Sequence, residues 1–213
     1  AFASRSTLGT GWAQKTVVWT FVVIHAAWGW WFFISLESVQ VPFGRISRDA
    51  YLSDPHVSYP APPYAAMLHI NEISPPESRV LVIGDARGYH MERPFVASSV
   101  CNLSPLAVWA EESSDAGALA DRLRKESISH ILVNAAEAYR TRNRKIMVLS
   151  ASALERLRQF WFSYLEGPWQ DIDRTEKHQR FLFVYKVRSG APAKPEAPPP
   201  PSFALPFPVT VTP

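Results

Sequence analysis

The stretch RVLVIGD, from Arg79 to Asp85, decides the fold of this chain. Aliphatic residues follow Arg79 without interruption, and a glycine and an aspartate end the run. A short, continuous apolar run of this kind is typical of a strand that is buried on both faces, as in a parallel sheet. The stretch therefore predicts an α/β domain built around this strand.

The neighbouring segments fit the same fold class. YAAMLHINEI, residues 64–73, has apolar residues at helical spacing and ends before two prolines. Residues 94–100 predict a second strand, Asp115 is a candidate N-cap for a helix through residue 125, and HILVN, residues 130–134, predicts another buried strand. Strand, helix and strand in this order indicate a βαβ unit with a right-handed crossover.

The last part of the domain follows from two further patterns. Ser152 and Glu155 have the spacing of a capping box and open a predicted helix, which Gly167 and Pro168 end. RFLFVYKV, residues 180–187, predicts a closing strand. We therefore expect a small Rossmann-like α/β sandwich over residues 64–188.

A second decisive stretch lies near the N-terminus. TVVWTFVVIHAAWGWWFFISL, residues 16–36, contains no Asp, Glu, Lys or Arg. A helix of this length is roughly 30 Å long and matches the hydrocarbon core of a bilayer. The aromatic residues at its end fit an interfacial belt. We expect a transmembrane helix after an N-terminal segment of residues 1–15; a signal peptide, whose apolar region is shorter, and a buried soluble helix are the alternatives.

His25 lies near the middle of this predicted helix. An ionisable group at the bilayer centre is costly and is a functional hypothesis by default. Its imidazole could ligate a metal, including the magnesium of a chlorophyll-type pigment; the alternative is a neutral histidine that is hydrogen-bonded to a neighbouring helix. Both interpretations require a membrane partner, and we expect Trp28 and Trp31 to contact it.

Two proline-rich segments flank the domain. Residues 37–63 form a connector that we expect to be extended, because proline is scattered through it. Residues 189–213 predict an extended proline-rich tail without a core of its own. Phe203, Leu205 and Phe207 in this tail are candidate anchors on a partner.

Charge and motifs narrow the function classes. The net charge is +3, and the basic residues are scattered, so we expect no nucleic-acid partner. The single cysteine, Cys101, can form neither an internal disulfide nor a cysteine-based zinc site. Neither G-x-S-x-G nor H-E-x-x-H occurs, so we assign no catalytic residue and no metal site.

Three local clusters have a functional and a structural interpretation. The turn from Gly84 to Gly88 could cradle a phosphate, or it could be a tight turn that Asp85 caps. Asp85, His90 and Glu92 could meet at a metal or act as acid and base, or be solvated loop residues. The basic run at residues 140–145 could meet lipid headgroups or be a solvated loop.

Longer stretches carry a family resemblance. FGRISRDAYLSDPHVSYPAPPYAAMLHINE from Phe43, SPPESRVLVIGDARGYHMERPFVAS from Ser74 and SISHILVN from Ser127 resemble the C-terminal extracytoplasmic domain of GT-C glycosyltransferases that use dolichyl- or polyprenyl-phosphate sugars. The resemblance runs to about Val187 and implies that the last transmembrane helix precedes the domain. That family's catalytic carboxylate sits in an early loop between spans, which this chain lacks, so the chain resembles a domain detached from its enzyme.

These features together favour a non-catalytic, single-pass accessory subunit of a multi-subunit membrane complex. His25 points towards a photosynthetic complex, and the expected partners are other membrane subunits and the lipid bilayer. The alternatives are the C-terminal domain of a GT-C glycosyltransferase and a sugar- or nucleotide-binding module. Nearby basic residues are balanced on the two sides of the predicted span, so only the resemblance places the domain on the extracytoplasmic side.

Overall fold

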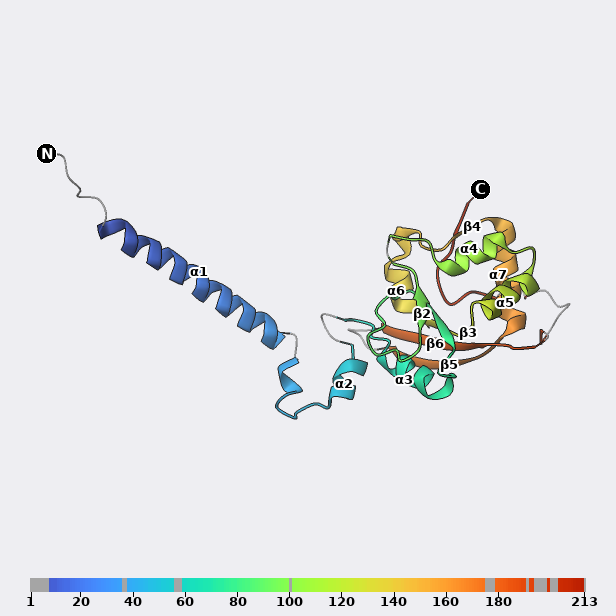
Figure 1. The fold of residues 1–213 in the computed structure, drawn as a ribbon, viewed down its shortest axis with the longest axis horizontal. Coiled ribbons are helices and arrows are strands. Elements are labelled where there is room, and N and C mark those ends of the chain that lie inside the picture. The colour runs from blue at the N-terminus through green and yellow to red at the C-terminus, as the bar shows by residue number, and fades with distance from the viewer. Residues whose placement is uncertain are drawn as a thin grey trace. The chain divides into compact units, whose positions relative to one another are not determined.

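The computed structural model describes residues 8–35, 38–55, 59–99, 101–174, 179–190, 192–193, 199 and 203–212. They form two compact units (Figure 1). The first unit reaches to Tyr51, and the second contains Leu52–Pro55 and the chain from Tyr59 onwards.

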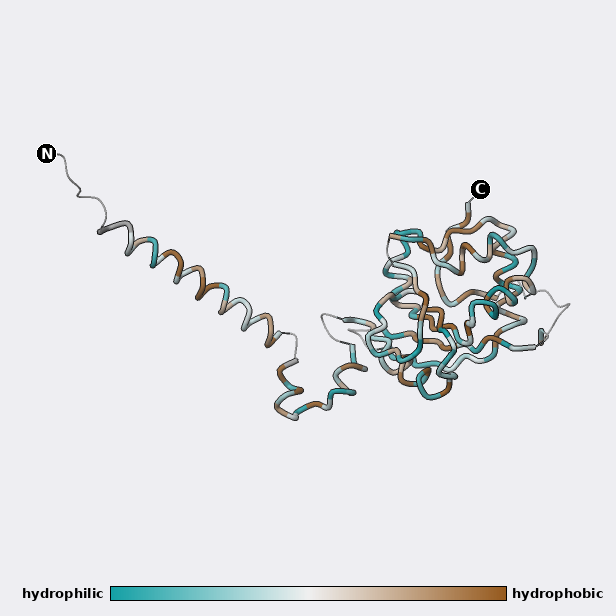
Figure 2. Tube along the Cα trace, viewed as in Figure 1, coloured by the Kyte–Doolittle hydropathy of each residue, from teal (hydrophilic) through white to brown (hydrophobic). Residues whose placement is uncertain are grey.

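The first unit is dominated by the helix α1, Leu8–Ser35. Within α1, Gly11–Ser35 is long and apolar enough to cross a membrane, and it is the one such helix among the residues that the structure describes. Figure 2 shows apolar residues on successive turns of this helix. The predicted apolar helix is therefore confirmed, although it begins about two turns earlier than the charge-free run.

The connector contains more regular structure than its prolines predicted. A short 3₁₀ helix, η1, covers Ser38–Gln40, and the helix α2 covers Arg48–Ser53. The backbone N–H of Ala50 donates to the hydroxyl of Ser47 at 3.1 Å and so caps the start of α2. The expectation of an irregular connector was wrong here, because Pro42 and Pro55 lie outside the helix and leave its hydrogen bonds intact.

The second unit is built on a mixed, five-stranded sheet with the strand order β2-β1-β3-β6-β5. β2 and β3 pair parallel to β1, β6 pairs antiparallel to β3, and β5 pairs antiparallel to β6. The strands are β1 Arg79–Ile83, β2 Phe95–Ala97, β3 Ile128–Asn134, β5 Leu165–Arg174 and β6 Gln179–Val187. The predicted α/β class is confirmed, and the sheet combines parallel and antiparallel pairs.

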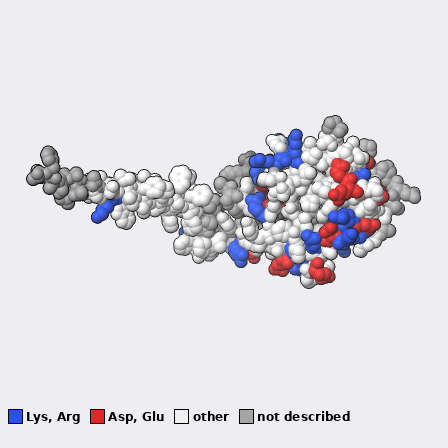
Figure 3. Space-filling model, turned by 45° about the horizontal axis from the view of Figure 1, so that its top comes forward, with Lys and Arg blue, Asp and Glu red and all other residues white. Residues whose placement is uncertain are grey.

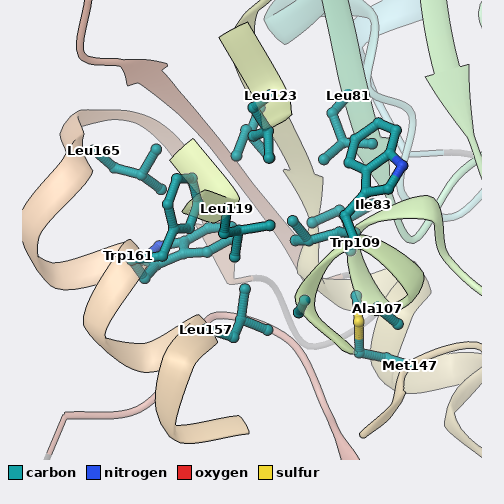
Figure 4. Close-up of a cluster of buried hydrophobic side chains, with 14 of the residues drawn as sticks. Leu81, Ile83, Ala107, Trp109, Leu119, Leu123, Met147, Leu157, Trp161 and Leu165 are labelled. Carbon is teal, nitrogen blue, oxygen red and sulfur yellow. The ribbon is translucent and has the colours of Figure 1, made fainter. Parts of the chain in front are cut away.

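Helices cover both faces of the sheet. On one face, Leu81 and Ile83 of β1 pack with the helices α4, α5 and α7 (Figures 1 and 4). On the other face, Val80 and Val82 pack with α3. Successive residues of β1 therefore enter two different cores, which is why its sequence is continuously apolar. The helices are α3 Tyr64–Ile73, α4 Pro105–Glu112, α5 Ala116–Lys125 and α7 Ala151–Tyr164.

Two predicted boundaries around α7 were wrong. Its N-cap is Ser150, whose hydroxyl accepts from the backbone N–H of Ala153 at 3.2 Å, and not Ser152. The helix ends at Tyr164, and the chain then runs directly into β5 and passes through Gly167 and Pro168 as a strand. β5 is the outermost strand and has an irregular register at this point, so a proline is tolerated there.

The end of the chain packs on its own domain. The strand β7, Thr210–Val211, pairs parallel with β4, Val148–Leu149. Phe207 is only 3% exposed, and its ring centroid lies 5.1 Å from that of Trp161. Phe207, which was predicted to anchor the tail on a partner, is therefore buried in its own domain, because the apolar side of α7 is available within the same chain.

Phe203 and Leu205 also contact this domain. Phe203 lies with its ring centroid 5.7 Å from that of Phe162, its carbonyl oxygen accepts from Arg158 at 3.1 Å, and Leu205 packs against the same core while remaining partly exposed. Residues 194–198 of the predicted tail lie outside the described residues. Whether Phe203 and Leu205 also contact a partner stays a prediction.

Candidate functional site

Three parallel strands end at the same edge of the sheet and place polar residues there. β1 is followed by Gly84 and Asp85, β2 by Ser98, and β3 ends at Asn134, which opens the helix α6, Ala135–Arg140. In open α/β sheets this carboxyl edge is the usual place of ligand sites. A hollow of about 270 Å³ lies at this edge. It is lined by Gly84, Asp85, Ala86, Arg87, Ser98, Ser99, Glu137, Arg140, Thr141 and Ile146.

The turn after β1 requires glycine at its first position. Gly84 has a φ of +91°, and a Cβ atom there would clash with the backbone carbonyl oxygen of Asn134. Only glycine adopts this conformation without strain and also permits the close approach. The turn therefore keeps the end of β1 against the start of α6 and directs Asp85 to the edge of the sheet.

Asp85 is the centre of a network of hydrogen bonds. Its carboxylate accepts from the backbone N–H of Arg87 at 2.9 Å, and from the Nε and Nη2 atoms of the same guanidinium at 2.9 and 3.0 Å. The side chain of Asp85 is 2% exposed. The prediction that Asp85 caps a tight turn is confirmed. The same bonds occupy the backbone N–H and the guanidinium that a phosphate cradle would use.

Tyr59 closes the network from a distant part of the chain. Its hydroxyl donates to Oδ2 of Asp85 at 2.6 Å, and the guanidinium carbon of Arg87 lies 3.5 Å from the centroid of its ring. Burial, followed by the hydrogen bond to Asp85, raises the pKa of the Tyr59 hydroxyl well above its usual value. The phenol is therefore held protonated as a donor to the carboxylate.

A second buried carboxylate completes the site. Glu137 has a side chain that is 4% exposed, and its Oε2 accepts from Arg140 at 2.6 Å, with Arg87 at 3.6 Å. Asn134 caps α6 by accepting from the backbone N–H of Glu137 at 3.3 Å, and it donates to the carbonyl oxygen of Ala61 at 2.8 Å. The pKa of Arg140 is raised, chiefly by its hydrogen bond to Glu137.

The site therefore contains two buried carboxylates and two guanidinium groups whose charges balance. Each carboxylate pairs with arginine, so its charge is compensated inside the domain. The guanidinium of Arg140 is exposed at the rim, where it can contact an anion or a partner's carboxylate. Chemically, the arrangement holds the segment at Tyr59–Ala61 onto the sheet and presents cationic groups at the edge.

The other predicted polar residues have separate contacts. The ring of His90 packs edge-on against Tyr64 with 4.8 Å between centroids, and the backbone N–H of Glu92 donates to Asn71 at 2.9 Å. Asp85, His90 and Glu92 therefore take part in different contacts. Among the described residues, no group of three or more His, Cys, Asp or Glu side chains could hold a metal ion.

His130 was expected at the start of a strand but lies inside β3. It is 2% exposed, and its Nδ1 lies 2.9 Å from the hydroxyl of Ser129. Burial, then the positive charges of Lys186 and His69, lowers its pKa to about 4. The buried imidazole is therefore neutral at neutral pH.

In the first unit, His25 has one ring nitrogen engaged. Its Nδ1 lies 2.9 Å from the carbonyl oxygen of Phe21, and the two ring centroids are 3.8 Å apart. A carbonyl can only accept, so this contact requires the proton on Nδ1 and leaves the lone pair on Nε2. In that tautomer, Nε2 is the ring nitrogen that could bind a metal.

Trp28 and Trp31 lie on the same helix as His25. Their ring centroids are 5.4 Å apart, and the side chains are 66% and 60% exposed. An isolated aromatic surface of this size on α1 is compatible with lipid or with another helix. Their role as partner contacts stays a prediction.

No family model, curated protein or solved structure matches this chain.

Proposed function

We propose that this chain is a non-catalytic module that α1 anchors in a membrane, where it supports the assembly of a larger membrane complex. The observation that carries the proposal is the combination of one apolar helix with a domain whose buried charges compensate each other. α1 exposes Trp, Phe and Val side chains along its length. Exposure of such an apolar surface is unfavourable in water and favourable in lipid.

The polar site of the domain supports a structural role rather than a chemical one. A general base or nucleophile needs a group that can accept or release a proton near neutral pH. In this site, Asp85 is held by Arg87 and Tyr59, and Glu137 is held by Arg140. Both carboxylates are thus engaged in ion pairs and hydrogen bonds within the domain.

His25 supports a partner inside the membrane. Its Nε2 could bind the magnesium of a chlorophyll-type pigment or accept a hydrogen bond from a neighbouring subunit. The first case places the chain in a photosynthetic complex, with the domain on the extracytoplasmic side as the family resemblance implies. Bound there, the pigment would supply light absorption, and His25 would supply only ligation and orientation.

A second candidate is the C-terminal domain of a GT-C membrane glycosyltransferase. The motivation is that the parts of this resemblance from Tyr59 onwards lie in one folded unit, including the turn at Gly84 and the strands β1 and β3. In this candidate the module supports donor or acceptor binding by catalytic spans that belong to the same enzyme.

The test is mild detergent extraction of native membranes, followed by capture with an antibody to the α/β domain. Denaturing electrophoresis, mass spectrometry and an absorption spectrum of the captured material separate the candidates. A polypeptide near 24.0 kDa with stoichiometric membrane partners supports the accessory subunit. A much larger polypeptide that contains this sequence and many spans supports the glycosyltransferase.

A matched pair of variants addresses the pigment. His25→Leu removes the ligand and should weaken any pigment absorption, whereas Thr20→Leu alters another polar residue of the same helix and should leave it unchanged. A chain that is captured alone, colourless and extractable without detergent would refute the membrane proposal.

A further inference from the structure

A compact group of basic residues follows α6 at one side of the domain. It comprises Arg140, Arg142 and Arg144 of the short 3₁₀ helix η2 (Arg142–Arg144), and Lys145, and all of these side chains are exposed. We call this group the basic surface. Arg140 pairs with Glu137, whereas Arg142, Arg144 and Lys145 have no ion pair with any other described residue. The surface therefore carries uncompensated positive charge.

The backbone holds these cations in a fixed arrangement. The N–H of Arg144 donates to the carbonyl of Thr141 at 2.8 Å, and Thr141 in turn bonds to the carbonyl of Glu137. Lys145 ends the turn in the left-handed region with a φ of 53°. A non-glycine residue in this region is uncommon and persists where its surroundings determine it. The basic surface is thus part of the folded structure rather than a loose loop.

Apolar groups border the basic surface. The side chain of Tyr139 is 50% exposed, and its carbonyl accepts from the guanidinium of Arg142 at 3.1 Å. Leu103 is 51% exposed and lies next to Ser104, whose N–H donates to the carbonyl of Ile146 at 2.7 Å. Charged and apolar side chains that share one face fit a lipid headgroup region, where both kinds of group are accommodated.

A hollow of about 330 Å³ opens beside the same cations. It is lined by Ile83, Ala138, Arg142, Asn143, Lys145, Ile146, Met147, Phe207, Pro208, Val209 and Thr210. Cationic side chains thus stand next to apolar ones around one concave surface. Figure 3 shows one group of basic side chains apart from the acidic ones, and other basic side chains interspersed with acidic side chains.

We propose that the basic surface docks the α/β domain onto a bilayer that contains anionic phospholipids. This inference rests on the proposed membrane anchor, because a tether raises the local concentration of lipid around the domain. Arg142, Arg144 and Lys145 contact the headgroup phosphates, and Tyr139 and Leu103 enter the interface beside them. The docking fixes which side of the domain faces the membrane.

The single cysteine gives a direct test without new labelling sites. Cys101 is exposed, and it lies close in the chain to Leu103. The full-length chain, labelled at Cys101 with a fluorophore, is reconstituted into vesicles of phosphatidylcholine alone or with phosphatidylglycerol. Both kinds of vesicle carry a quencher on their headgroups. We expect quenching to be at least about twofold stronger with phosphatidylglycerol. This difference should disappear in 0.5 M salt, because charges are then screened over roughly a few ångströms.

Matched charge removal identifies the residues responsible. Arg144→Gln with Lys145→Gln should remove most of the difference between the two lipids. Arg122→Gln with Lys125→Gln removes the same charge from exposed positions of α5 and should preserve it. Equal quenching in both lipids, or equal loss in both variants, overturns the inference.

Anchoring is scored separately by resistance to alkaline carbonate extraction. A chain that resists extraction but shows no lipid dependence refutes the docking and leaves the membrane anchor standing. A chain that carbonate removes from the vesicles refutes the anchor itself.

Discussion

The hydroxyl of Tyr59 donates a hydrogen bond of 2.6 Å to the buried carboxylate of Asp85. This bond joins the segment before α3 to the turn after β1, and the guanidinium of Arg87 packs on the ring of the same tyrosine. The pair therefore connects two parts of the domain that are distant in sequence. The Tyr59 hydroxyl is also an uncharged hydrogen-bond donor to the buried carboxylate of Asp85.

Tyr59→Phe should destabilise the domain by about 1–3 kcal/mol, because it leaves a buried charged acceptor short of one hydrogen bond. The free energy of unfolding, measured by urea titration, tests this. Tyr139→Phe, at a half-exposed position, is the control and should change stability by less than about 0.5 kcal/mol. Equal effects of the two variants would show that the bond to Asp85 contributes nothing.

The same tyrosine predicts a response to alkaline pH. Its pKa is raised in the folded state by burial and by Asp85, so the unfolded chain releases this proton above about pH 10 while the folded chain keeps it. The contribution of Tyr59 to the free energy of unfolding should therefore be constant below about pH 10 and fall as the pH rises further. In the Tyr59→Phe variant, stability should fall less steeply at alkaline pH. Part of the fall should remain, because burial also raises the pKa of Tyr185.

His130 predicts a loss of stability in mild acid. Its pKa is lowered to about 4, so between about pH 6.5 and pH 4 the unfolded chain binds a proton that the folded chain does not. Stability should fall across this window as the pH decreases, by about 3 kcal/mol in total from this residue. His130→Gln should show a shallower slope in urea titrations from pH 7 to pH 4. An unchanged slope would assign the acid sensitivity to other groups.

Gly84→Ala tests the close approach of β1 to α6. The new Cβ would meet the carbonyl oxygen of Asn134 in a backbone conformation that already disfavours alanine. We expect a destabilisation of more than about 2 kcal/mol or failure to fold. Gly190→Ala is the matched control, because nothing lies within 4 Å of the added methyl group. A folded Gly84→Ala domain of wild-type stability would contradict the geometry of this turn.

Phe207→Ala tests whether the end of the chain belongs to the core. Removing a buried phenylalanine typically costs about 3–5 kcal/mol, through lost burial and the cavity left beside Trp161. Val211→Ala, at a position that is 47% exposed, should cost much less. Thermal or urea unfolding of the two variants distinguishes a structural tail from one that only rests on the surface.

Local patterns predicted the elements that carry an uninterrupted signal. The helix at Tyr64–Ile73 and the strand β1 were expected from periodicity and from a continuous apolar run, and both exist. β5 was missed because its residues alternate with charges and include Gly167 and Pro168, which signal a break unless the strand is known to lie at the sheet edge. α4 was also missed, although Pro105 at its first turn was a usable signal.

The site was predicted only in its local part. Asp85 capping its own turn is a short-range contact, and the sequence suggested it. Tyr59 contacts Asp85, and Glu137 contacts Arg87, across long distances in the sequence. Only the strand order brings these residues together. The tail shows the same limit, since its composition indicated an extended segment but not the surface on which Phe207 packs.

The pairing of β7 with β4 has a consequence for biosynthesis. The ribosome delivers α1 long before Phe207 and β7, because they lie near opposite ends of this sequence. Domains fold as units once their residues have emerged. The apolar helix therefore leaves the ribosome while the domain still lacks the pieces that close it.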